Sequence, residues 1–185
     1  MIFRPAPIAD AWLIDLEPQT DARGFFVRMY CEREFSAHGL NTRWAQTNHS
    51  YSKKPGTLRG MHYQCGRFAE TKMVRCLSGA VHDVIIDLRP SSPTCRRWFG
   101  VDLEASRSAW LYVPKGFAHG FLTLTPDVEM AYMVSEYYAP EAQRGVRYDD
   151  PHFGIAWPRK VEVISPRDES WPDFDPASGD PLSGA

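Results

Sequence analysis

Four side chains that could carry acid–base chemistry stand in strand-like or turn-like surroundings. His62 lies in the stretch RGMHYQ, and histidine is the residue type that most often serves as a general base. Lys72 opens an apolar run, KMVRCL, where an inward-facing ammonium needs an anionic partner. Tyr132 lies in VEMAYMVSEYY and Asp168 in SPRDES. Taken singly, each also has a structural explanation, as a strand histidine, a lysine that reaches water, a core tyrosine or a turn aspartate.

The histidines first suggest a metal site. β-Barrels that hold iron or zinc often use a His-x-His pair, a downstream Glu and a further His. Here the pair would read His62-Tyr63-Gln64, so the second ligand is missing. His82, His119 and Glu129 could still be gathered by the fold, but no spacing requires it. The residues therefore favour proton transfer, and we expect no metal.

Two strand-like stretches carry unusual polarity. Arg59 and His62 are three positions apart, so strict alternation would face them oppositely, but Gly60 between them permits a bulge that brings both to one cavity. The stretch QTNHSYS at 46–52 alternates amides and hydroxyls with Thr, His and Tyr. A solvated edge strand gives this pattern, and so does a strand that points polar groups into a ligand cavity. Both interpretations stay open.

The elements that must position these residues are short strands. They recur about every ten residues, separated by Pro and Gly turns, as in a β-sandwich or barrel. One short helix is expected at 31–38, ended by Gly39, and Ser78-Gly79 predicts a hairpin between two apolar runs. No long 3.6-residue periodicity occurs, so the expected fold is all-β with a few short helices. The predicted strands are 12–16, 25–30, 44–51, 57–64, 72–77, 81–88, 98–103, 109–113, 120–125 and 128–136.

Composition bounds the remaining possibilities. The 185 residues fit one domain, expected at 1–174, followed by a flexible Pro/Gly/Ser/Asp-rich tail at 175–185. Net charge is −2 with no basic run, which argues against nucleic acid or a membrane as partner. The N-terminus lacks the apolar region of a signal peptide, so we expect a cytoplasmic protein. The 4 cysteines form no CxxC pair and are expected to be structural thiols.

A series of specific motifs runs in order along roughly residues 10 to 174. The motifs are Asp21-x-Arg23-Gly24-x-Phe26, Gln46-x-Asn48-x-Ser50, Gly56-x-Leu58-Arg59-Gly60-x-His62-Tyr63-Gln64, Lys72-x-Val74, Gly79-x-Val81-x-Asp83-Val84, Pro114-x-Gly116-Phe117-Ala118-His119-Gly120-Phe121, Tyr132, Tyr137-Tyr138-x-Pro140, Asp149-Asp150-Pro151, Ile155-x-Trp157-Pro158 and Ser165-x-x-Asp168. The most specific are LRGxHYQ and PxGFAHGF. In these motifs the chain resembles the dTDP-4-dehydrorhamnose 3,5-epimerase family of cupin-like jelly rolls.

The resemblance implies a reaction without metal or cofactor. The substrate would be a nucleotide-diphosphate 4-keto-6-deoxy sugar, whose C4 ketone acidifies the protons on C3 and C5. By this resemblance His62 would abstract the proton, with Asp168 orienting the imidazole. Lys72 would stabilise the enolate oxygen. Tyr132 would return a proton from the opposite face and so invert the centre.

The resemblance also implies a set of substrate contacts. Arg59 and His119 would touch the diphosphate or the sugar. In this family part of the nucleotide site comes from the partner subunit, so a homodimer is implied. The full set of implied binding positions is Arg23, Phe26, Arg28, Gln46, Asn48, Arg59, His119, Gln143 and Arg167.

The chain departs from the family pattern away from the catalytic positions. Arg28 and Gln143 each stand where Glu is usual, and Gly66-Arg67-Phe68-Ala69-Glu70 replaces a stretch with a usual proline and glutamine. A carboxylate only accepts hydrogen bonds, whereas a guanidinium only donates them. Arg28 therefore suggests a shifted base preference, such as a CDP-linked sugar. The alternative is that Arg28 points to solvent and changes nothing.

Three other functions compete with double epimerisation. Epimerisation at C3 alone would use the same base and acid. A metal-dependent cupin oxygenase is a different class of enzyme, against which the missing second ligand argues. A silent sugar-nucleotide-binding protein would not need an acid and a base together.

Overall fold

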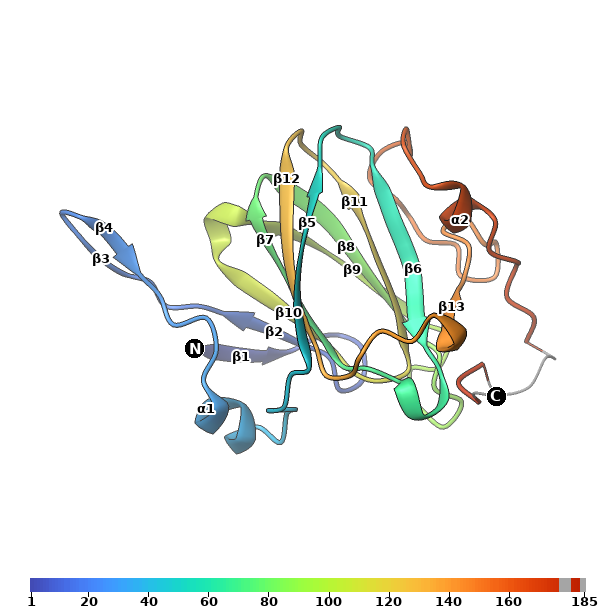
Figure 1. Cartoon of the computed structure of the whole chain (residues 1–185), viewed down its shortest axis with the longest axis horizontal. Helices are drawn as coiled ribbons and strands as arrows, with labels where there is room; N and C mark the ends of the chain where they lie inside the picture. The colour runs from blue at the N-terminus through green and yellow to red at the C-terminus, as the bar shows by residue number, and fades with distance from the viewer. Residues whose placement is uncertain (177–180, 184–185) are drawn as a thin grey trace.

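Two antiparallel sheets face each other in the computed structural model, which describes residues 1–176 and 181–183 (Figure 1). The six-stranded sheet has the order β1 (Ile2–Pro5), β2 (Trp12–Asp15), β10 (Ala109–Val113), β7 (Lys72–Ser78), β12 (Val128–Val134) and β5 (Gln46–Ser52). The five-stranded sheet has the order β13 (Gln143–Gly145), β6 (Leu58–Gln64), β11 (Phe117–Thr123), β8 (Ala80–Asp87) and β9 (Trp98–Glu104). The chain crosses between the sheets repeatedly, and the expected jelly-roll sandwich is confirmed.

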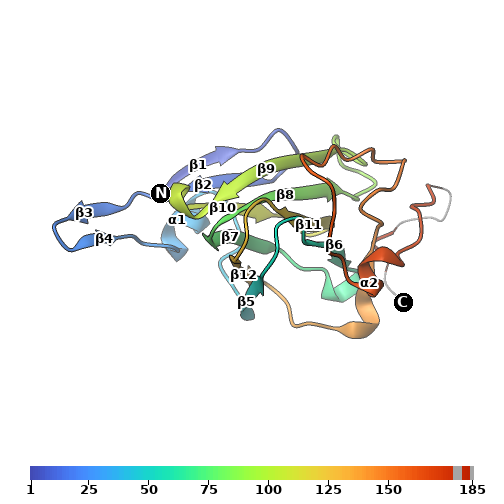
Figure 2. The same ribbon diagram turned by 90° about the horizontal axis from the view of Figure 1, so that it is seen from above.

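A small hairpin stands apart from this sandwich. It consists of β3 (Gln19–Asp21) and β4 (Gly24–Phe26), which pair only with each other. Both views show it projecting beyond the sheets, at the end opposite to the short helix α2 (Pro166–Glu169) (Figures 1 and 2). The other helical segments are α1 (Glu32–Ala37) and three 3₁₀ turns, η1 (Gly66–Phe68), η2 (Ala105–Arg107) and η3 (Pro140–Ala142).

Apolar side chains form three layers around the two sheets. The inner layer lies between the sheets and includes Val74 and Leu111 from one sheet and Ile85 and Phe121 from the other. The outer face of the six-stranded sheet is covered by α1, whose Phe35 is fully buried. The outer face of the five-stranded sheet is covered by the C-terminal segment. The central strands are buried on both faces. A polar cavity can therefore replace part of the apolar layer between the sheets, because the outer layers still shield the strands from solvent.

A glycine contact joins β6 to β11. Opposite Gly120 of β11, β6 places two residues, Gly60 and Met61, so the pairing shifts by one between His62 and Arg59. A Cβ on Gly60 would lie 2.5 Å from the Gly120 Cα, and Gly60 has φ +139°. Only glycine fits this close, left-handed position. The expected bulge at Gly60 is confirmed.

Two sequence predictions about strands are wrong. The strand expected at 25–30 ends at Phe26, because residues 27–30 have no neighbouring strand and instead pack Val27 and Tyr30 against the outer face of the six-stranded sheet. Ser78-Gly79 does not close a hairpin. β7 and β8 follow one another but pair in different sheets, so this turn carries the chain across the sandwich. Turn-forming residues indicate that the chain changes direction. They do not indicate which strand the following strand will pair with.

Other elements agree with the sequence or were missed by it. The helix expected at 31–38 is α1 with its two caps, and Gly39 follows with φ +67°. The four cysteines are free thiols. The sequence did not predict the short strands β1, β3 and β13 or the helix α2, whose Asp168 resembled a turn residue. Within the described part of the chain, no helix is long and apolar enough to cross a membrane.

The tail expected to be flexible is described only in part. Leu182 packs against the outer layer of the five-stranded sheet, and its carbonyl accepts a hydrogen bond of 2.9 Å from the Gly66 N–H. Residues 177–180 and 184–185 lie outside the described residues. A flexible tail at 175–185 stays a prediction.

The glycine contact gives a first test. A Cβ at Gly120 would lie 2.6 Å from the Met61 sulfur and 2.8 Å from the Arg59 carbonyl, so Gly120→Ala should lower the free energy of unfolding by about 3 kcal/mol. The control is Gly39→Ala, where a Cβ meets nothing within 4 Å and the left-handed backbone alone costs about 1 kcal/mol. Urea unfolding followed by circular dichroism measures both. Equal losses for the two variants would contradict the steric argument.

Candidate active site

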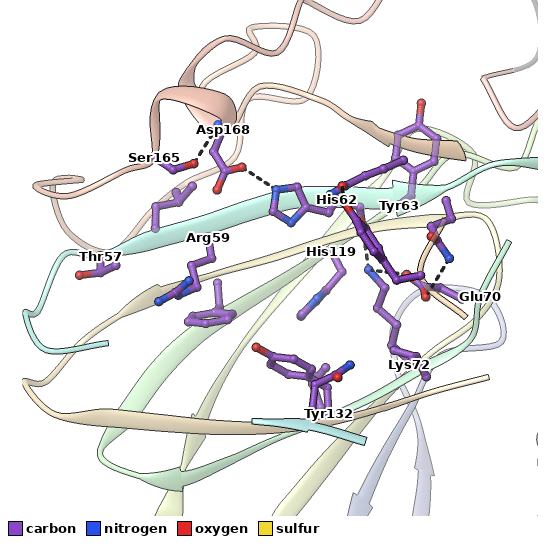
Figure 3. Close-up of a pocket in the computed structure, with 18 of the residues that line it drawn as sticks. Thr57, Arg59, His62, Tyr63, Glu70, Lys72, His119, Tyr132, Ser165 and Asp168 are labelled. Carbon is purple, nitrogen blue, oxygen red and sulfur yellow. Dashed lines mark hydrogen bonds and ion pairs between the residues drawn. The ribbon is translucent and has the colours of Figure 1, made fainter. Parts of the chain in front are cut away.

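A cavity of about 570 Å³ opens between the two sheets, beside α2. Both sheets contribute to it, and so does the segment that leads into the helix. Most of the expected site residues line it (Figure 3). These are His62, Lys72, Tyr132, Asp168, Gln46, Asn48, Arg59, His119 and Gln143.

The His62 imidazole is held by Asp168. Its Nε2 lies 2.6 Å from an Asp168 carboxylate oxygen, and Asp168 is only 5% exposed. The other carboxylate oxygen accepts the Gly60 N–H at 3.3 Å. The Asp168 N–H donates to the Ser165 hydroxyl, which caps α2. The second ring nitrogen of His62 faces the cavity, where it can accept a proton (Figure 3).

The Asp168 carboxyl is stabilised in its charged form. Burial raises its pKa, but the hydrogen bond and charge of His62 and the Gly60 N–H outweigh burial, so the pKa lies below its usual value. A charged Asp168 fixes the orientation of the imidazole and would stabilise the imidazolium that forms when His62 takes a proton.

Tyr132 lies on the opposite wall. It projects from β12 of the six-stranded sheet, whereas His62 projects from β6 of the five-stranded sheet. The phenol and the imidazole therefore face each other across the cavity (Figure 3). A molecule bound between them would meet a base on one face and an acid on the other.

Two further basic side chains in the cavity, Lys72 and His119, are paired with carboxylates. The Lys72 ammonium lies 3.2 Å from Glu70 and donates to the His62 carbonyl at 3.2 Å. His119, the cross-strand neighbour of His62, places Nε2 3.0 Å from both oxygens of Asp83, which is fully buried.

Arg59 differs from these two side chains. Its guanidinium donates to the Ser52 hydroxyl at 3.2 Å and to the Tyr51 carbonyl at 3.0 Å, which are both neutral acceptors. Of the described cationic side chains that line the cavity, Arg59 is the one that forms no ion pair with a carboxylate. Its charge is therefore available to an anionic ligand.

The mouth of the cavity carries amides and tyrosines. Gln46 accepts the Tyr138 N–H at 2.9 Å, and the Tyr138 hydroxyl donates to the Gln143 amide oxygen at 2.7 Å. Gln46 and Asn48 line the cavity from β5, while His49 and Tyr51 on the same strand are exposed. Both interpretations of the stretch 46–52 therefore hold, because β5 is an edge strand and also a cavity strand.

Four expected binding residues do not line this cavity. Arg23 and Phe26 lie on the projecting hairpin, where Phe26 is 68% exposed. Arg28 lines a smaller cavity of about 150 Å³. Arg167 places its guanidinium 5.7 Å from the centre of the Trp171 ring. The main cavity of one chain does not bring these four to the catalytic groups.

Three residues, Asp83, Glu70 and Tyr138, contact side chains of the site but have no role assigned from the sequence. Asp83 had a detectable signal, because it lies between Val81 and Ile85 on the buried face of a strand, where a carboxylate needs a partner. Glu70 lies outside any strand, so alternation gives no direction for its side chain. Tyr138 contributes a hydroxyl from a loop. Among residues 1–176 and 181–183, no three His, Cys, Asp or Glu side chains are grouped as a metal site would need.

Comparisons with known proteins agree with this arrangement. A sequence model described as dTDP-4-dehydrorhamnose 3,5-epimerase matches residues 5–176. A curated protein of that name from Sinorhizobium fredii is 40% identical over 175 residues, covering 94% of this chain and 90% of its own. Another, from Escherichia coli K12, is 43% identical over 158 residues, covering 83% and 85%.

Solved structures are similar over nearly the whole chain. A dTDP-6-deoxy-D-glucose-3,5-epimerase from Legionella pneumophila, in complex with dTDP-4-keto-L-rhamnose, has a TM-score of 0.92 at 33% identity and covers 100% of this chain and 98% of its own. A 3'-monoepimerase from Streptomyces bikiniensis, in complex with dTDP-quinovose, has a TM-score of 0.85 at 36% identity and covers 91% and 86%.

The His62–Asp168 pair predicts how stability depends on pH. The pKa of Asp168 is lower in the folded protein, so its contribution is complete above the unfolded value of about 3.9 and is lost as pH falls through the folded value. Asp168→Asn should therefore lower the free energy of unfolding by about 2 kcal/mol at pH 7, and the difference should shrink below about pH 4. Urea unfolding at a series of pH values measures it. Glu169→Gln, at the exposed neighbour, is the control, and a difference that does not vary with pH would refute the assignment.

Proposed function

The chain belongs to the dTDP-4-dehydrorhamnose 3,5-epimerase family, whose members are isomerases of sugar nucleotides, and from this premise we propose that it inverts C3 and C5 of a dTDP-linked 4-keto-6-deoxyhexose in deoxysugar biosynthesis. The observation that carries the proposal is the placement of the His62–Asp168 pair and Tyr132 on opposite walls of one cavity. Inversion at carbon needs a proton to leave from one face and to return to the other, and this cavity offers a group for each step.

The ketone at C4 makes the first step accessible. Loss of a proton from C3 or C5 forms an enolate, whose negative charge is spread onto the C4 oxygen. The cavity-facing nitrogen of His62 takes the proton, and Asp168 stabilises the resulting imidazolium. The C–H electron pair becomes part of the enolate, so no oxidant or reductant is needed.

Lys72 stabilises the enolate. Its ammonium is largely buried on the six-stranded sheet, where a cation stabilises a developing oxyanion more strongly than it would in water. Tyr132 then donates its proton to the opposite face of the carbon, which inverts the centre. His62 releases its proton to water and Tyr132 takes one from water, and a second cycle at the other carbon then gives the double epimer.

Arg59, which forms no ion pair with a carboxylate among the described residues, suits the rest of the substrate. Arg59 has neutral acceptors as its only hydrogen-bond partners in the described structure, and a guanidinium binds diphosphate oxygens well. His119, held by Asp83, offers its imidazole to the sugar or to the diphosphate. Gln46, Asn48 and Gln143 lie at the mouth, where the nucleoside would emerge.

The hairpin supports a homodimer. Arg23 and Phe26 are too exposed on the projecting β3–β4 hairpin to act in their own cavity, and two adjacent exposed phenylalanines at 65% and 68% are unusual for a free surface. We propose that the hairpin reaches the cavity of a second copy of the chain. There Phe26 would pack on the base, and Arg23 would contact the nucleotide.

The relatives and solved structures support dTDP as the nucleotide, since their names and ligands carry it. The CDP hypothesis depended on Arg28. This residue lies in the smaller cavity with Glu34 and Glu17, which already surround it with negative charge. A shifted base preference stays a prediction, to be tested with matched dTDP and CDP sugars.

Epimerisation at C3 alone is the second candidate. The similar 3'-monoepimerase supports it, because that enzyme has the same fold and 36% identity. The base and acid do not distinguish the two outcomes.

Proton exchange in heavy water tests the proposal. With dTDP-4-keto-6-deoxyglucose, deuterium should enter at both C3 and C5, whereas label at C3 alone would favour the second candidate. His62→Ala should abolish exchange. Tyr132→Phe should slow epimerisation by about 10²-fold or more yet still permit exchange without inversion, because His62 can return a deuteron to the same face. No exchange by the wild type with either the dTDP or the CDP sugar would refute the function.

Subunit complementation tests the hairpin. Arg23→Ala/Phe26→Ala and His62→Ala should each fold and each lose most activity, since one lacks the nucleotide contacts and the other the base. A mixed dimer should contain one site of its two with both intact, so the purified mixed dimer should recover about half of wild-type activity. Co-expression with two different affinity tags yields the mixed dimer for assay. Absence of recovery, or a monomer in sedimentation, would exclude a shared site.

A further inference from the structure

The Lys72 ammonium is almost completely enclosed. Its side chain is 11% exposed, and so is that of Glu70, its partner at 3.2 Å. An ammonium taken out of water at this depth needs a negative partner and hydrogen-bond acceptors. Glu70 supplies the charge, and the His62 carbonyl supplies a second acceptor at 3.2 Å. Two of the three N–H bonds are thereby occupied, and tetrahedral geometry fixes where the third points.

Glu70 is itself held in place by Gln64. The Gln64 amide nitrogen donates to Glu70 at 3.2 Å and to the carbonyls of Phe68 and Tyr137. The Gln64 amide oxygen accepts the Ala139 N–H at 2.6 Å. These backbone contacts prevent the amide from turning over, because a flipped amide would place its nitrogen against the Ala139 N–H.

In this chain, both side-chain oxygens of Glu70 therefore act as acceptors. One oxygen of Glu70 faces the Gln64 amide nitrogen and the other faces the Lys72 ammonium, and both of these groups only donate. An amide at position 70 would turn an N–H toward one of the two donors. A carboxylate fits this position. The backbone at 137–139 fixes Gln64, Gln64 fixes Glu70, and Glu70 in turn fixes the Lys72 ammonium.

We propose that Glu70 is the positioning residue for Lys72, and that it holds the ammonium aimed at the enolate oxygen before the substrate binds; this inference rests on the proposed function. Glu70 also has an opposing effect, because its negative charge weakens the field of Lys72 at the oxygen. If positioning dominates, removing the carboxylate slows the reaction. If the electrostatic effect dominates, removing the carboxylate speeds the reaction. The sign of the change in kcat therefore distinguishes the two effects.

The experiment is a double-mutant cycle on purified full-length protein with dTDP-4-keto-6-deoxyglucose. Glu70→Gln should lower kcat by about tenfold or more, with little change in KM, since misplacing a catalytic group costs rate and Glu70 holds Lys72 rather than the nucleotide. In a Lys72→Met background the same change should have less than about a twofold further effect. Glu141→Gln, at an exposed carboxylate, is the control. A tenfold loss that persists without Lys72, or a rise in kcat, would overturn the proposal.

Two further measurements distinguish a loss of Lys72 positioning from misfolding of the variants. Glu70→Ala should regain activity on addition of formate, a carboxylate small enough for the vacated space, and should not respond to chloride. In thermal unfolding, Lys72→Met should melt lower than Lys72→Met/Glu70→Gln, because the single variant leaves a buried carboxylate without its cation. Failure of both would overturn the pairing even if the substrate were another sugar nucleotide. A wild type that neither exchanges nor turns over would refute the proposed function, whereas an active wild type with unaffected Glu70 variants would refute only this inference.

Discussion

The close contact between Gly60 and Gly120 is the constraint on which the rest of the site depends. A regular strand would turn Arg59 and His62 to opposite sides of the sheet. The extra residue opposite Gly120 shifts the alternation of side chains along β6, so Arg59 and His62 both enter the cavity. The same contact places the Gly60 N–H on Asp168. Backbone packing, with no polar side chain involved, thus sets the geometry of the proton-transfer pair.

Charge pairing is the second organising feature. Three basic side chains of the cavity, His62, Lys72 and His119, each have a carboxylate partner, and the partners come from different parts of the chain. Asp168 joins the C-terminal segment to β6, and Asp83 joins β8 to the neighbouring β11. These pairs allow ionised groups to lie inside a sandwich whose remaining interior is apolar. They also make one cation, Arg59, different from the others, and this difference gives the cavity a preferred end for an anion.

The sequence predicted the sandwich, most strands and the four central groups, because alternation and motif spacing are local properties. It could place the bulge at Gly60, since a glycine between two polar residues has a local meaning. It failed where the outcome depended on which strands become neighbours. Ser78-Gly79 has the composition of a hairpin turn, yet its flanking strands join different sheets. It also failed for Glu70, whose direction is set by a chain of hydrogen bonds through Gln64 to a loop more than sixty residues away.

The proposed base, His62, and the proposed acid, Tyr132, belong to different sheets, and this has a consequence for how such a protein changes over time. The distance between His62 and Tyr132 is the distance between two layers, and core side chains such as Ile85, Leu111 and Phe121 maintain that distance. A methylene gained or lost in this core alters the gap across which a proton must be delivered. Inherited variation in apolar residues with no chemistry of their own can therefore alter the spacing between the two walls of the cavity, while every titratable group stays the same.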